Sequence, residues 1–451
     1  MAVTEESTDT RRIDDFRESG VRLVHLLYAD LHGIARGKVI PIGEFPHIAA
    51  DGIPFVSAIM TVDLRHNVVG GFETGFFDIL ARPDLSTLVH VPWAPHVAWC
   101  LADLETVGGD APYPVDPRGV LRRVVSAYDD LGLTPIIGPE LEFYLCELDA
   151  TVPCGYRRYM NKDSHVYTVG STADTLGILE RMLETCVALD LGVFAANQEY
   201  GRGQYEINIG HSPALESADR AFLFKTLVKE MAAQDDLLAT FMGKPWNDDE
   251  GSGFHLHLSI GNVSSANAFA DPNGDDGLSP ILRHFVAGIL AHAPALMAFL
   301  NPTVNAYRRL HPEALVPTRV NWGHDNRFTL IRIPRERGKA TRVEIRVADG
   351  TANPYLAYAS ALLAGLDGIN RELEPPSPLA GMIYELPEEQ QGPELPATLP
   401  EAIAALQVDE VLKEGLGQEL IDAFLTIKSA ELDRYRKWVS DWEFAEYSHH
   451  L

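Results

Sequence analysis

The sequence predicts an α+β protein of two domains, with a small, mostly β unit over residues 12–110 and a larger unit over residues 111–451. Short apolar runs separated by Gly and Pro, which are typical of strands, fill the first part of the chain. A turn-rich segment, GGDAPYPVD, follows at residues 108–116, and strands and helices alternate beyond it. A chain of 451 residues is also long for one compact core.

Each predicted element has a local reason. The strands of the small unit are VRLVHLLYADL, GKVIPI, TLVHVPW and HVAWCLADL. A helix is expected from Pro117, because PRGVLRRVVSAYDDLG has Pro early and Gly at its end. The tail from about Glu401 has helical apolar spacing. The longest apolar run, Phe285 to Leu300, is too short to span a bilayer and contains His292 and Pro294, so we expect a buried helix.

Composition limits the classes of partner. A formal net charge of −27 makes nucleic acid and anionic membranes poor partners, because a polyanion repels both. The polar N-terminus lacks the apolar core of a signal peptide, and the four cysteines form no CxxC pair, so we expect a cytoplasmic protein. Between Arg308 and Arg346, however, ten Lys or Arg residues accompany four Asp or Glu residues. Such a segment is typical either of a local anion site or of a solvated ion-pair surface.

Four predicted strands carry polar side chains on one face and apolar side chains on the other, because side chains alternate along a strand. Their sequences are GPELEFYL, GQYEINIG, GFHLHLSI and TRVEIRVA. The polar faces hold Glu140 and Glu142; Gln204, Glu206 and Asn208; His255, His257 and Ser259; and Arg342, Glu344 and Arg346. One such strand alone is typical of a solvated sheet face, but four together favour a shared functional site.

The residue types on these faces indicate phosphate chemistry. Carboxylates with one or two imidazoles suit Mg²⁺ or Mn²⁺, and arginines bind phosphate through paired donors. Together they indicate phosphoryl transfer from ATP. The chain has no GxxxxGK[ST] loop, since the nearest string, Gly33 to Lys38, has the wrong spacing, and no GxGxxG opens a helix. A nucleotide must therefore be held by metal and side chains.

Seven strings follow one another along the chain: GPELEF, NQEYGRGQYEIN, GSGFHLHLS, NAYRRL, DNRFTLIRIP, RVEIR and NPYLA. In these motifs and in their order the chain resembles the glutamine synthetase superfamily, and the resemblance runs from about residue 20 to the end of the chain. The resemblance implies a small β-grasp-like N-terminal domain and a large catalytic domain with a curved antiparallel sheet and surrounding helices. It also implies a homo-oligomeric ring, commonly a dodecamer, in which a neighbour's N-terminal domain completes each site.

The resemblance implies a metal role for six residues, with two or three Mg²⁺ or Mn²⁺ ions in each site. The residues that match ligands of the metal beside glutamate are Glu142, Glu199 and Glu206. Those that match ligands of the metal at the ATP phosphates are Glu140, His255 and Glu344. Glu199 is identified by the resemblance alone, because the alternation of side chains does not single it out.

The resemblance also implies roles in binding and catalysis. Arg309 matches the arginine that holds the substrate α-carboxylate, Arg346 matches another arginine at the glutamate, and the Gly251 backbone matches a substrate contact. The residues that match groups steadying the phosphates are Arg327, Arg332 and Lys339. Those on the nucleotide side are His257, Ser259 and Arg342.

The implied reaction has two steps. The γ-carboxylate of glutamate attacks the γ-phosphorus of ATP, which gives γ-glutamyl phosphate and ADP, and a neutral amine then displaces phosphate through a tetrahedral intermediate. Metals and arginines would cancel the charge on the transferring group, which accounts for the basic segment.

Two acids of true glutamine synthetases are missing. Val56, in GIPFVSAI, stands where a GxxFDGSS-like segment has its ammonium-binding aspartate, and Leu315 stands where a PGYEAP-like flap has its glutamate. A less anionic, more apolar pocket disfavours ammonium and accommodates an amine with a carbon substituent. The chain therefore resembles the glutamate–amine ligase branch, which makes γ-glutamyl amides, and a monoamine or aromatic amine fits better than a polyamine.

Two alternatives remain. One is a glutamine synthetase that uses ammonia and in which a nearby acid, Asp63 or Glu313, replaces the missing ones. The other is an inactive ring protein with a structural or regulatory role, which would have lost metal or phosphate ligands, whereas all the matching residues are present. Tyr384, in MIYELPEE, resembles the adenylylated tyrosine of some bacterial glutamine synthetases, but we expect an ordinary loop tyrosine.

Overall fold

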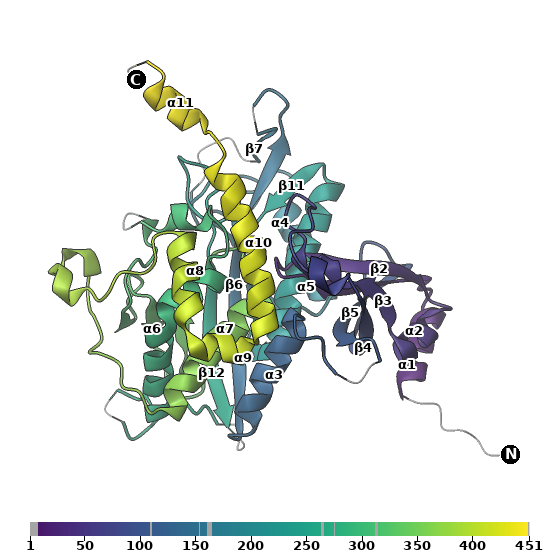
Figure 1. Ribbon diagram of the computed structural model, residues 1–451, viewed down its shortest axis with the longest axis horizontal. Coiled ribbons are helices and arrows are strands. Elements are labelled where there is room, and N and C mark those ends of the chain that lie inside the picture. Colours follow the sequence, from purple (N-terminus) through teal and green to yellow (C-terminus); the bar gives the residue numbers. More distant parts are fainter. Residues whose placement is uncertain are drawn as a thin grey trace.

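Two β-sheets organise the chain in the computed structural model, which describes residues 8–108, 111–152, 154–159, 165–262, 266–274, 276–311, 314–449 and 451. The five-stranded sheet uses residues 23–106, and the ten-stranded sheet uses residues 133–345. Figure 1 shows the smaller sheet, in purple and dark blue, beside the larger body. The predicted α+β class is confirmed, while the domain boundary at residues 110–111 stays a prediction.

The smaller sheet has the strand order β2-β1-β5-β4-β3. Its unit contains α1 (Thr8–Glu18), β1 (Leu23–Ala29), β2 (Ala35–Pro41), α2 (Phe45–Asp51), β3 (Ile53–Val56), β4 (Asp78–His90) and β5 (Val97–Thr106). β1 and β5 run parallel, and the other neighbouring strands run antiparallel. The predicted strand TLVHVPW overlaps only the last residues of β4, which begins earlier, at Asp78, and ends at His90. The prediction missed the first part of β4 because Arg82, Pro83 and Asp84 interrupt its apolar pattern.

The larger sheet has the order β13-β14-β15-β12-β6-β9-β8, and three further strands also pair with β6. Its strands are β6 (Leu133–Leu148), β7 (Tyr156–Arg158), β8 (Val193–Gln198), β9 (Gln204–Ile209), β10 (Ser212–Pro213), β11 (Leu237–Thr240), β12 (Phe254–Asn262), β13 (Trp322–His324), β14 (Ile331–Ile333) and β15 (Val343–Ile345). Along this order only β13 and β14 pair in parallel. The 16-residue β6 is therefore the centre of the sheet.

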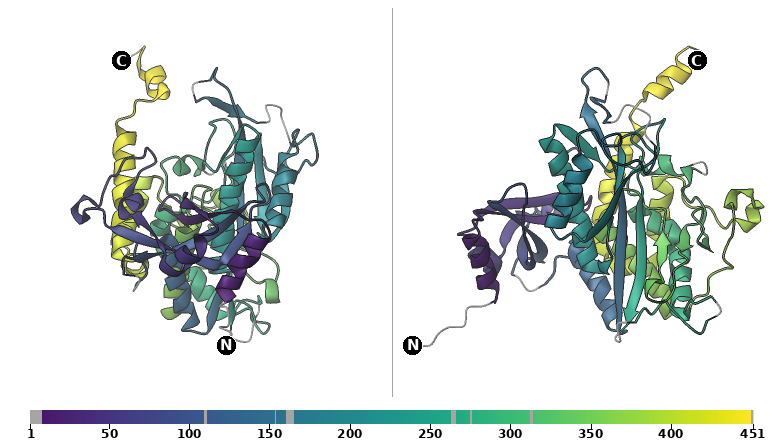
Figure 2. Two further views of the ribbon diagram at one scale, coloured as in Figure 1. Left: turned by 90° about the vertical axis from the view of Figure 1, so that its right-hand side faces the viewer. Right: turned by 180° about the vertical axis from the view of Figure 1, so that it is seen from behind.

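Helices cover one face of the larger sheet. They are α3 (Pro117–Asp129), α4 (Ile178–Ala188), α5 (Ala214–Gln234), α6 (Pro280–Leu300), α7 (Pro354–Asn370), α8 (Leu399–Val408), α9 (Glu410–Leu416) and α10 (Gln418–Arg436). The last helix, α11 (Asp441–Tyr447), buries none of its residues and extends away from the sheet. Figure 1 shows α7, α9 and α10 in front of β6 and β12, whereas the view from behind in Figure 2 shows these strands uncovered. Leu141, Phe143 and Leu256 are fully buried beneath the helices, which leaves the polar faces of the strands on the open side.

Helix α6 differs from the prediction in length but not in burial. It begins at Pro280, where the Ser279 hydroxyl accepts from Leu282 N at 3.2 Å, and it runs for 21 residues. By length and composition alone it is long and apolar enough to cross a membrane, so the estimate from Phe285 to Leu300 was too short. Because 72% of its most apolar window is buried inside the protein, the predicted buried helix is confirmed.

A buried arginine connects the small sheet to the helices that pack on the larger sheet. Arg118, in the first turn of α3, forms ion pairs with Asp84 of β4 at 2.8 Å, Asp103 of β5 at 2.6 Å and Asp219 of α5 at 2.8 Å. Removing one member of such a network would leave a buried charge without its partner, which is strongly destabilising. The network therefore holds the small sheet against the helices of the large unit.

His292 of α6 is a buried histidine with an acid on either side. Its Nδ1 lies 2.6 Å from Asp409 Oδ2 at the start of α9, and its Nε2 lies 3.0 Å from Asp367 Oδ2 on α7. Burial alone would lower the pKa of His292, but the two carboxylates raise it above its ordinary value. The imidazole therefore links three helices, and the two carboxylates favour its charged form.

We expect His292→Gln to lower the midpoint of thermal unfolding by several degrees at pH 6 and by less at pH 9. A raised folded-state pKa contributes stability that is fully present below the unfolded value of about 6.5 and is lost as pH rises through the folded value. Calorimetric scans at both pH values measure the difference, with His47→Gln, an exposed histidine, as the control. An equal loss at both pH values would contradict a protonated His292.

Candidate active site

The antiparallel register of four strands gathers the polar faces on the open side of the larger sheet. Glu140 of β6 lies opposite His255 of β12 and Asn208 of β9, and Glu142 lies opposite Glu206 of β9. On the other side of β12, His257 lies opposite Glu344 of β15. Four strings that are far apart in the sequence therefore meet at one place, because each strand sends its polar side chains in the same direction.

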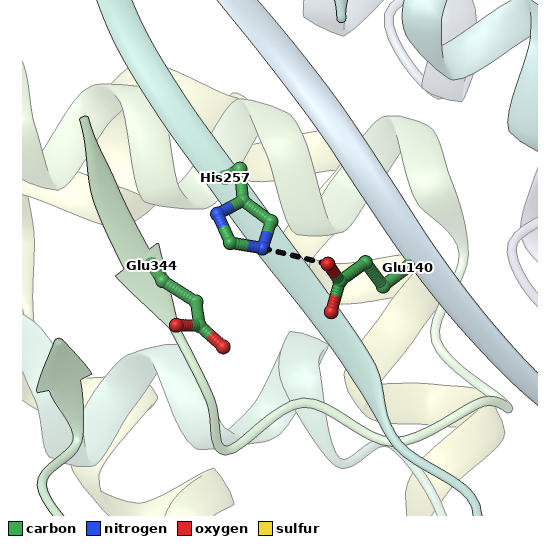
Figure 3. A group of neighbouring side chains, drawn as sticks. All are labelled: Glu140, His257 and Glu344. Atoms are coloured by element: carbon green, nitrogen blue, oxygen red, sulfur yellow. Dashed lines mark hydrogen bonds and ion pairs between the residues drawn. The ribbon is translucent and has the colours of Figure 1, made fainter. Parts of the chain in front are cut away.

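Glu140, His257 and Glu344 form one group whose ligand atoms all lie within 4.8 Å of one another (Figure 3). His257 Nε2 lies 3.1 Å from Glu140 Oε1, and Arg342 Nε donates to His257 Nδ1 at 3.2 Å. That donation leaves the proton of a neutral imidazole on Nε2, facing Glu140. A divalent cation bound here would displace this proton.

A second group consists of Glu140, Glu206 and His255, with ligand atoms that also lie within 4.8 Å of one another. His255 Nδ1 lies 3.4 Å from Glu140 Oε2 and 3.9 Å from Glu344 Oε1. The structure therefore brings together Glu140, His255 and Glu344, which the resemblance assigns to one metal, and Glu140 belongs to both groups. The assignment of each ligand to one particular ion stays a prediction.

Glu142 and Glu199 extend the acidic cluster. Glu142 Oε2 accepts from Gln204 Nε2 and from Gly253 N, both at 2.9 Å. Glu199 follows the last residue of β8, and its Oε1 accepts from Asn197 Nδ2 at 2.7 Å. Its place beyond the end of the strand explains why the alternation of side chains did not reveal it.

Three of these acids hold their protons more strongly than usual. Burial, followed by the charges of the other carboxylates, raises the pKa of Glu206 to about 9. Burial and Glu199 raise the pKa of Glu142 to about 7, and burial also raises the pKa of Glu199. The ionised forms of these acids therefore lack a compensating positive charge, and a bound cation would stabilise them. The cluster's oxygen-rich donor set with imidazole nitrogens fits Mg²⁺ or Mn²⁺.

Glu140 and Glu344 shift in the opposite direction. Burial opposes their ionisation, but hydrogen bonds from the two histidines lower the pKa of Glu140, and Arg346 and the histidines lower that of Glu344 to about 2. Arg332 Nη1 donates to Glu344 Oε2 at 2.6 Å, and Arg346 Nη1 donates to Glu344 Oε1. The charged Glu344 thus holds two arginines beside the acidic cluster.

Arg309 is buried and is anchored to the backbone. Its Nη2 donates to Val347 O at 2.9 Å and to Ala348 O, and its Nε has no partner among the residues that the structure describes. A Cβ on Gly251 would stand 2.5 Å from Arg309 Cδ, so these two predicted substrate contacts are immediate neighbours. By contrast, the predicted phosphate residues Arg327 and Lys339 are exposed.

A cavity of about 260 Å³ opens beside this cluster. Its lining includes five predicted residues: Glu140, His257, Ser259, Lys339 and Arg342. Phe194 and His211, which the sequence analysis missed, also line it. Phe194 lies on β8 and is 72% exposed, which is unusual for a large apolar side chain and marks it as a functional candidate. Its exposure is visible only in the structure.

Three predicted residues lie elsewhere. Val56 is 48% exposed and Leu315 is 53% exposed, and neither lines the cavity beside Glu140. The Tyr384 hydroxyl donates to Val316 O at 3.2 Å, which is consistent with an ordinary loop tyrosine.

Asp63, one candidate for a replacement acid, already has several partners. Its carboxylate accepts from Arg65 N at 2.7 Å and from Asn67 N at 2.9 Å, and it pairs with Arg434 of α10. Although burial opposes its ionisation, these hydrogen bonds lower the pKa of Asp63. It is therefore poorly suited to bind ammonium. Glu313, the other candidate, lies outside the described residues.

A family model described as the glutamine synthetase catalytic domain matches residues 114–447. Glutamine synthetases of Methanocaldococcus jannaschii and Staphylococcus aureus are both 35% identical to the chain, over 451 and 448 residues. Each alignment covers 96% of this chain and 97% of the relative.

Solved structures resemble the chain over almost its whole length. A complex of GmaS, a γ-glutamylmethylamide synthetase, with ADP has a TM-score of 0.87 and 33% identity, and the match covers 97% of this chain and 99% of that structure. A structure described as a novel glutamine synthase homologue has a TM-score of 0.81 and 28% identity, with 94% and 97% coverage. The predicted fold, with its curved antiparallel sheet and surrounding helices, is confirmed. The identity to GmaS and to the glutamine synthetases is almost equal, so identity does not separate the two activities.

We expect Glu140→Gln to weaken Mn²⁺ binding by about 10–100-fold, because Glu140 belongs to both ligand groups. Titration followed by electron paramagnetic resonance measures this affinity without any substrate. Glu147→Gln is the matched control, because Glu147 lies on the same strand but pairs with Arg157 near the surface. An unchanged Mn²⁺ affinity in the Glu140 variant would exclude a metal site on this face.

Proposed function

The chain belongs to the glutamine synthetase family, and we propose that it joins the γ-carboxylate of glutamate to an amine, with conversion of ATP to ADP and phosphate. The product is a γ-glutamyl amide. The family establishes the coarser activity, a ligase that forms C–N bonds. The choice of an amine over ammonia depends on the acceptor side of the site, which is the part that binds the nitrogen nucleophile.

The observation that carries this choice is the loss of acids at that side. Val56 and Leu315 stand where the family has its ammonium-binding aspartate and its flap glutamate. Asp63, one candidate for a replacement acid, is already engaged by Arg434 and by backbone donors. An apolar acceptor pocket favours a nucleophile with a carbon substituent. The resemblance to GmaS supports the same conclusion.

We assign the two groups around Glu140 to Mg²⁺ or Mn²⁺, which when bound would neutralise the phosphates of ATP. Arg309 and the backbone at Gly251 hold the α-carboxylate end of glutamate. This orientation presents the γ-carboxylate to the γ-phosphorus of ATP, with ADP as the leaving group. Arg332 and Arg346, which are fixed by Glu344, stabilise the negative charge on the transferring phosphoryl group.

The cavity beside Glu140 is assigned to the nucleotide. His257, Ser259 and Arg342 contribute polar groups to its lining, while Phe194 and His211 contribute aromatic rings, which suit a purine. In the second step the neutral amine attacks the γ-glutamyl phosphate carbonyl carbon and phosphate leaves. The amine nitrogen loses a proton as the amide forms, and the departing phosphate accepts it.

Glutamine synthesis from ammonia is the second candidate, because the curated relatives at 34–35% identity are named glutamine synthetases. An inactive ring protein is not favoured, because the metal and phosphate residues are all present.

We further propose a ring, with a dodecamer favoured, in which the exposed Val56 of one chain faces the site of its neighbour.

We expect phosphate release from ATP, with glutamate and Mg²⁺, to be faster with primary monoamines than with ammonium. The panel is methylamine, ethylamine, benzylamine, aniline and putrescine, each compared with ammonium at equal concentration of free base. Mass spectrometry should identify the γ-glutamyl amide. Ammonium turnover equal to that of the best amine would overturn the amine preference, and no turnover with any acceptor would overturn the ligase assignment for this chain.

We expect Glu344→Gln to reduce phosphate release by about 10²-fold or more, because it removes the charge that orients Arg332 and Arg346. Thermal unfolding of the variant establishes that it is folded. Glu388→Gln is the control, because Glu388 is exposed and pairs with Arg319, outside the cluster. Near-normal turnover in Glu344→Gln would refute the proposed role of Glu344.

A further inference from the structure

A second cavity, of about 240 Å³, lies where the β1–β2 loop, α5, β11, the start of α7 and α10 meet. Its lining contains none of the residues assigned above to metal, nucleotide or glutamate. Most of its lining is apolar, including Leu31, Ile34, Leu238, Phe241, Met242 and Phe424. The acidic cluster and this cavity are therefore chemically different sites.

Three lysines, Lys225, Lys229 and Lys428, line this cavity, and no Asp or Glu is among its described lining residues, although the chain has a formal net charge of −27. Lys428 pairs with Glu431 at 3.1 Å, which leaves Lys225 and Lys229 to recognise an anion. The Nζ atoms of Lys225 and Lys229 lie 5.3 and 5.8 Å from the centroid of the same Phe241 ring. Two ammonium groups beside one ring repel each other, and an anion held between them would relieve this repulsion.

Lys225 is buried and retains bonding capacity. Its Nζ donates to Gly350 O and Ala352 O, each at 2.9 Å, and the structure describes no acceptor for its third proton. Burial, followed by the charge of Lys229, lowers the pKa of Lys225 to about 7, which agrees with a poorly compensated charge. A carboxylate oxygen in the cavity would supply the missing acceptor in a charge-assisted hydrogen bond.

We propose that this cavity binds a small monocarboxylate with a compact apolar body, with the carboxylate between Lys225 and Lys229. The volume lies below the range of about 300–1,000 Å³ that is typical of drug-sized ligands, so a single ring or a short branched chain fits. Glutamate fits poorly, because its ammonium group would meet lysines and apolar walls. The inference does not depend on the reaction proposed above.

The cavity shares a wall with the glutamate side of the active site. Thr351 and Asn353 line the cavity, and the chain just before them supplies the carbonyls that anchor Arg309. Gly350 O accepts from Lys225, and Gly350 N donates to Ser252 O at 3.2 Å, beside Gly251. The cavity therefore borders the same segment of the chain as the Arg309 anchor, but it does not include the two carbonyls that hold Arg309.

Fluorine NMR with 4-fluorobenzoate on the full chain tests this proposal. We expect 4-fluorobenzoate to bind at least tenfold more tightly than the neutral 4-fluorobenzyl alcohol, because the lysines recognise the carboxylate. Saturating glutamate and ADP should change its affinity by less than twofold. Equal affinity for the two probes, or displacement by glutamate, would overturn the proposal, because the probe would then lack carboxylate selectivity or would occupy the glutamate site.

Two variants locate the bound probe. Met242→Trp fills the cavity from a side chain that is 40% exposed, and Lys225→Met removes the buried ammonium. We expect each to weaken 4-fluorobenzoate binding at least tenfold, while Leu148→Trp, at another exposed apolar position outside the cavity, leaves it unchanged. Unchanged binding in Met242→Trp would overturn the proposal, even if Lys225→Met fails to fold.

Discussion

The antiparallel register of β12, β6 and β9 is the constraint on which the rest of the site depends. Because side chains alternate with a period of two, a slip of one residue would turn Glu140 and Glu142 into the core and bring Leu141 and Phe143 to the open face. The helices that bury the apolar face therefore also define the polar one. Packing of the core and placement of the candidate ligands are consequences of the same register.

Charge is distributed so that anionic substrates can approach an acidic protein. The carboxylates around Glu206 form an anionic centre suited to divalent cations, and Glu344 connects this centre to Arg332 and Arg346. Under the proposed function, bound cations and these arginines would lie on one face and would share the charge of a transferring phosphoryl group. The proposal thereby gives the basic segment between Arg308 and Arg346 the role of a local anion site within a chain of high negative charge.

The two cavities differ in what they can recognise. The one beside Glu140 combines carboxylate, imidazole and guanidinium groups, as a metal–nucleotide complex requires. The one around Phe241 combines lysines with apolar walls, which suits an apolar carboxylate. The two cavities share no described lining residue, since one contains Glu140 and the other contains Thr351 and Asn353, a few residues beyond the carbonyls that anchor Arg309.

The sequence by itself determined which side chains share a face in each of the four strands, and which residue types stand on the polar faces. It also determined that acids are missing at Val56 and Leu315. Each of these is a local pattern or a local residue identity. Only the tertiary structure decided that Glu140 belongs to both ligand groups, that Phe194 lines a cavity and that Lys225 and Lys229 lie beside the same Phe241 ring. It also decided that Asp63 is occupied by Arg434, a residue 371 positions away. Such pairings arise from packing between distant segments, which no local pattern records.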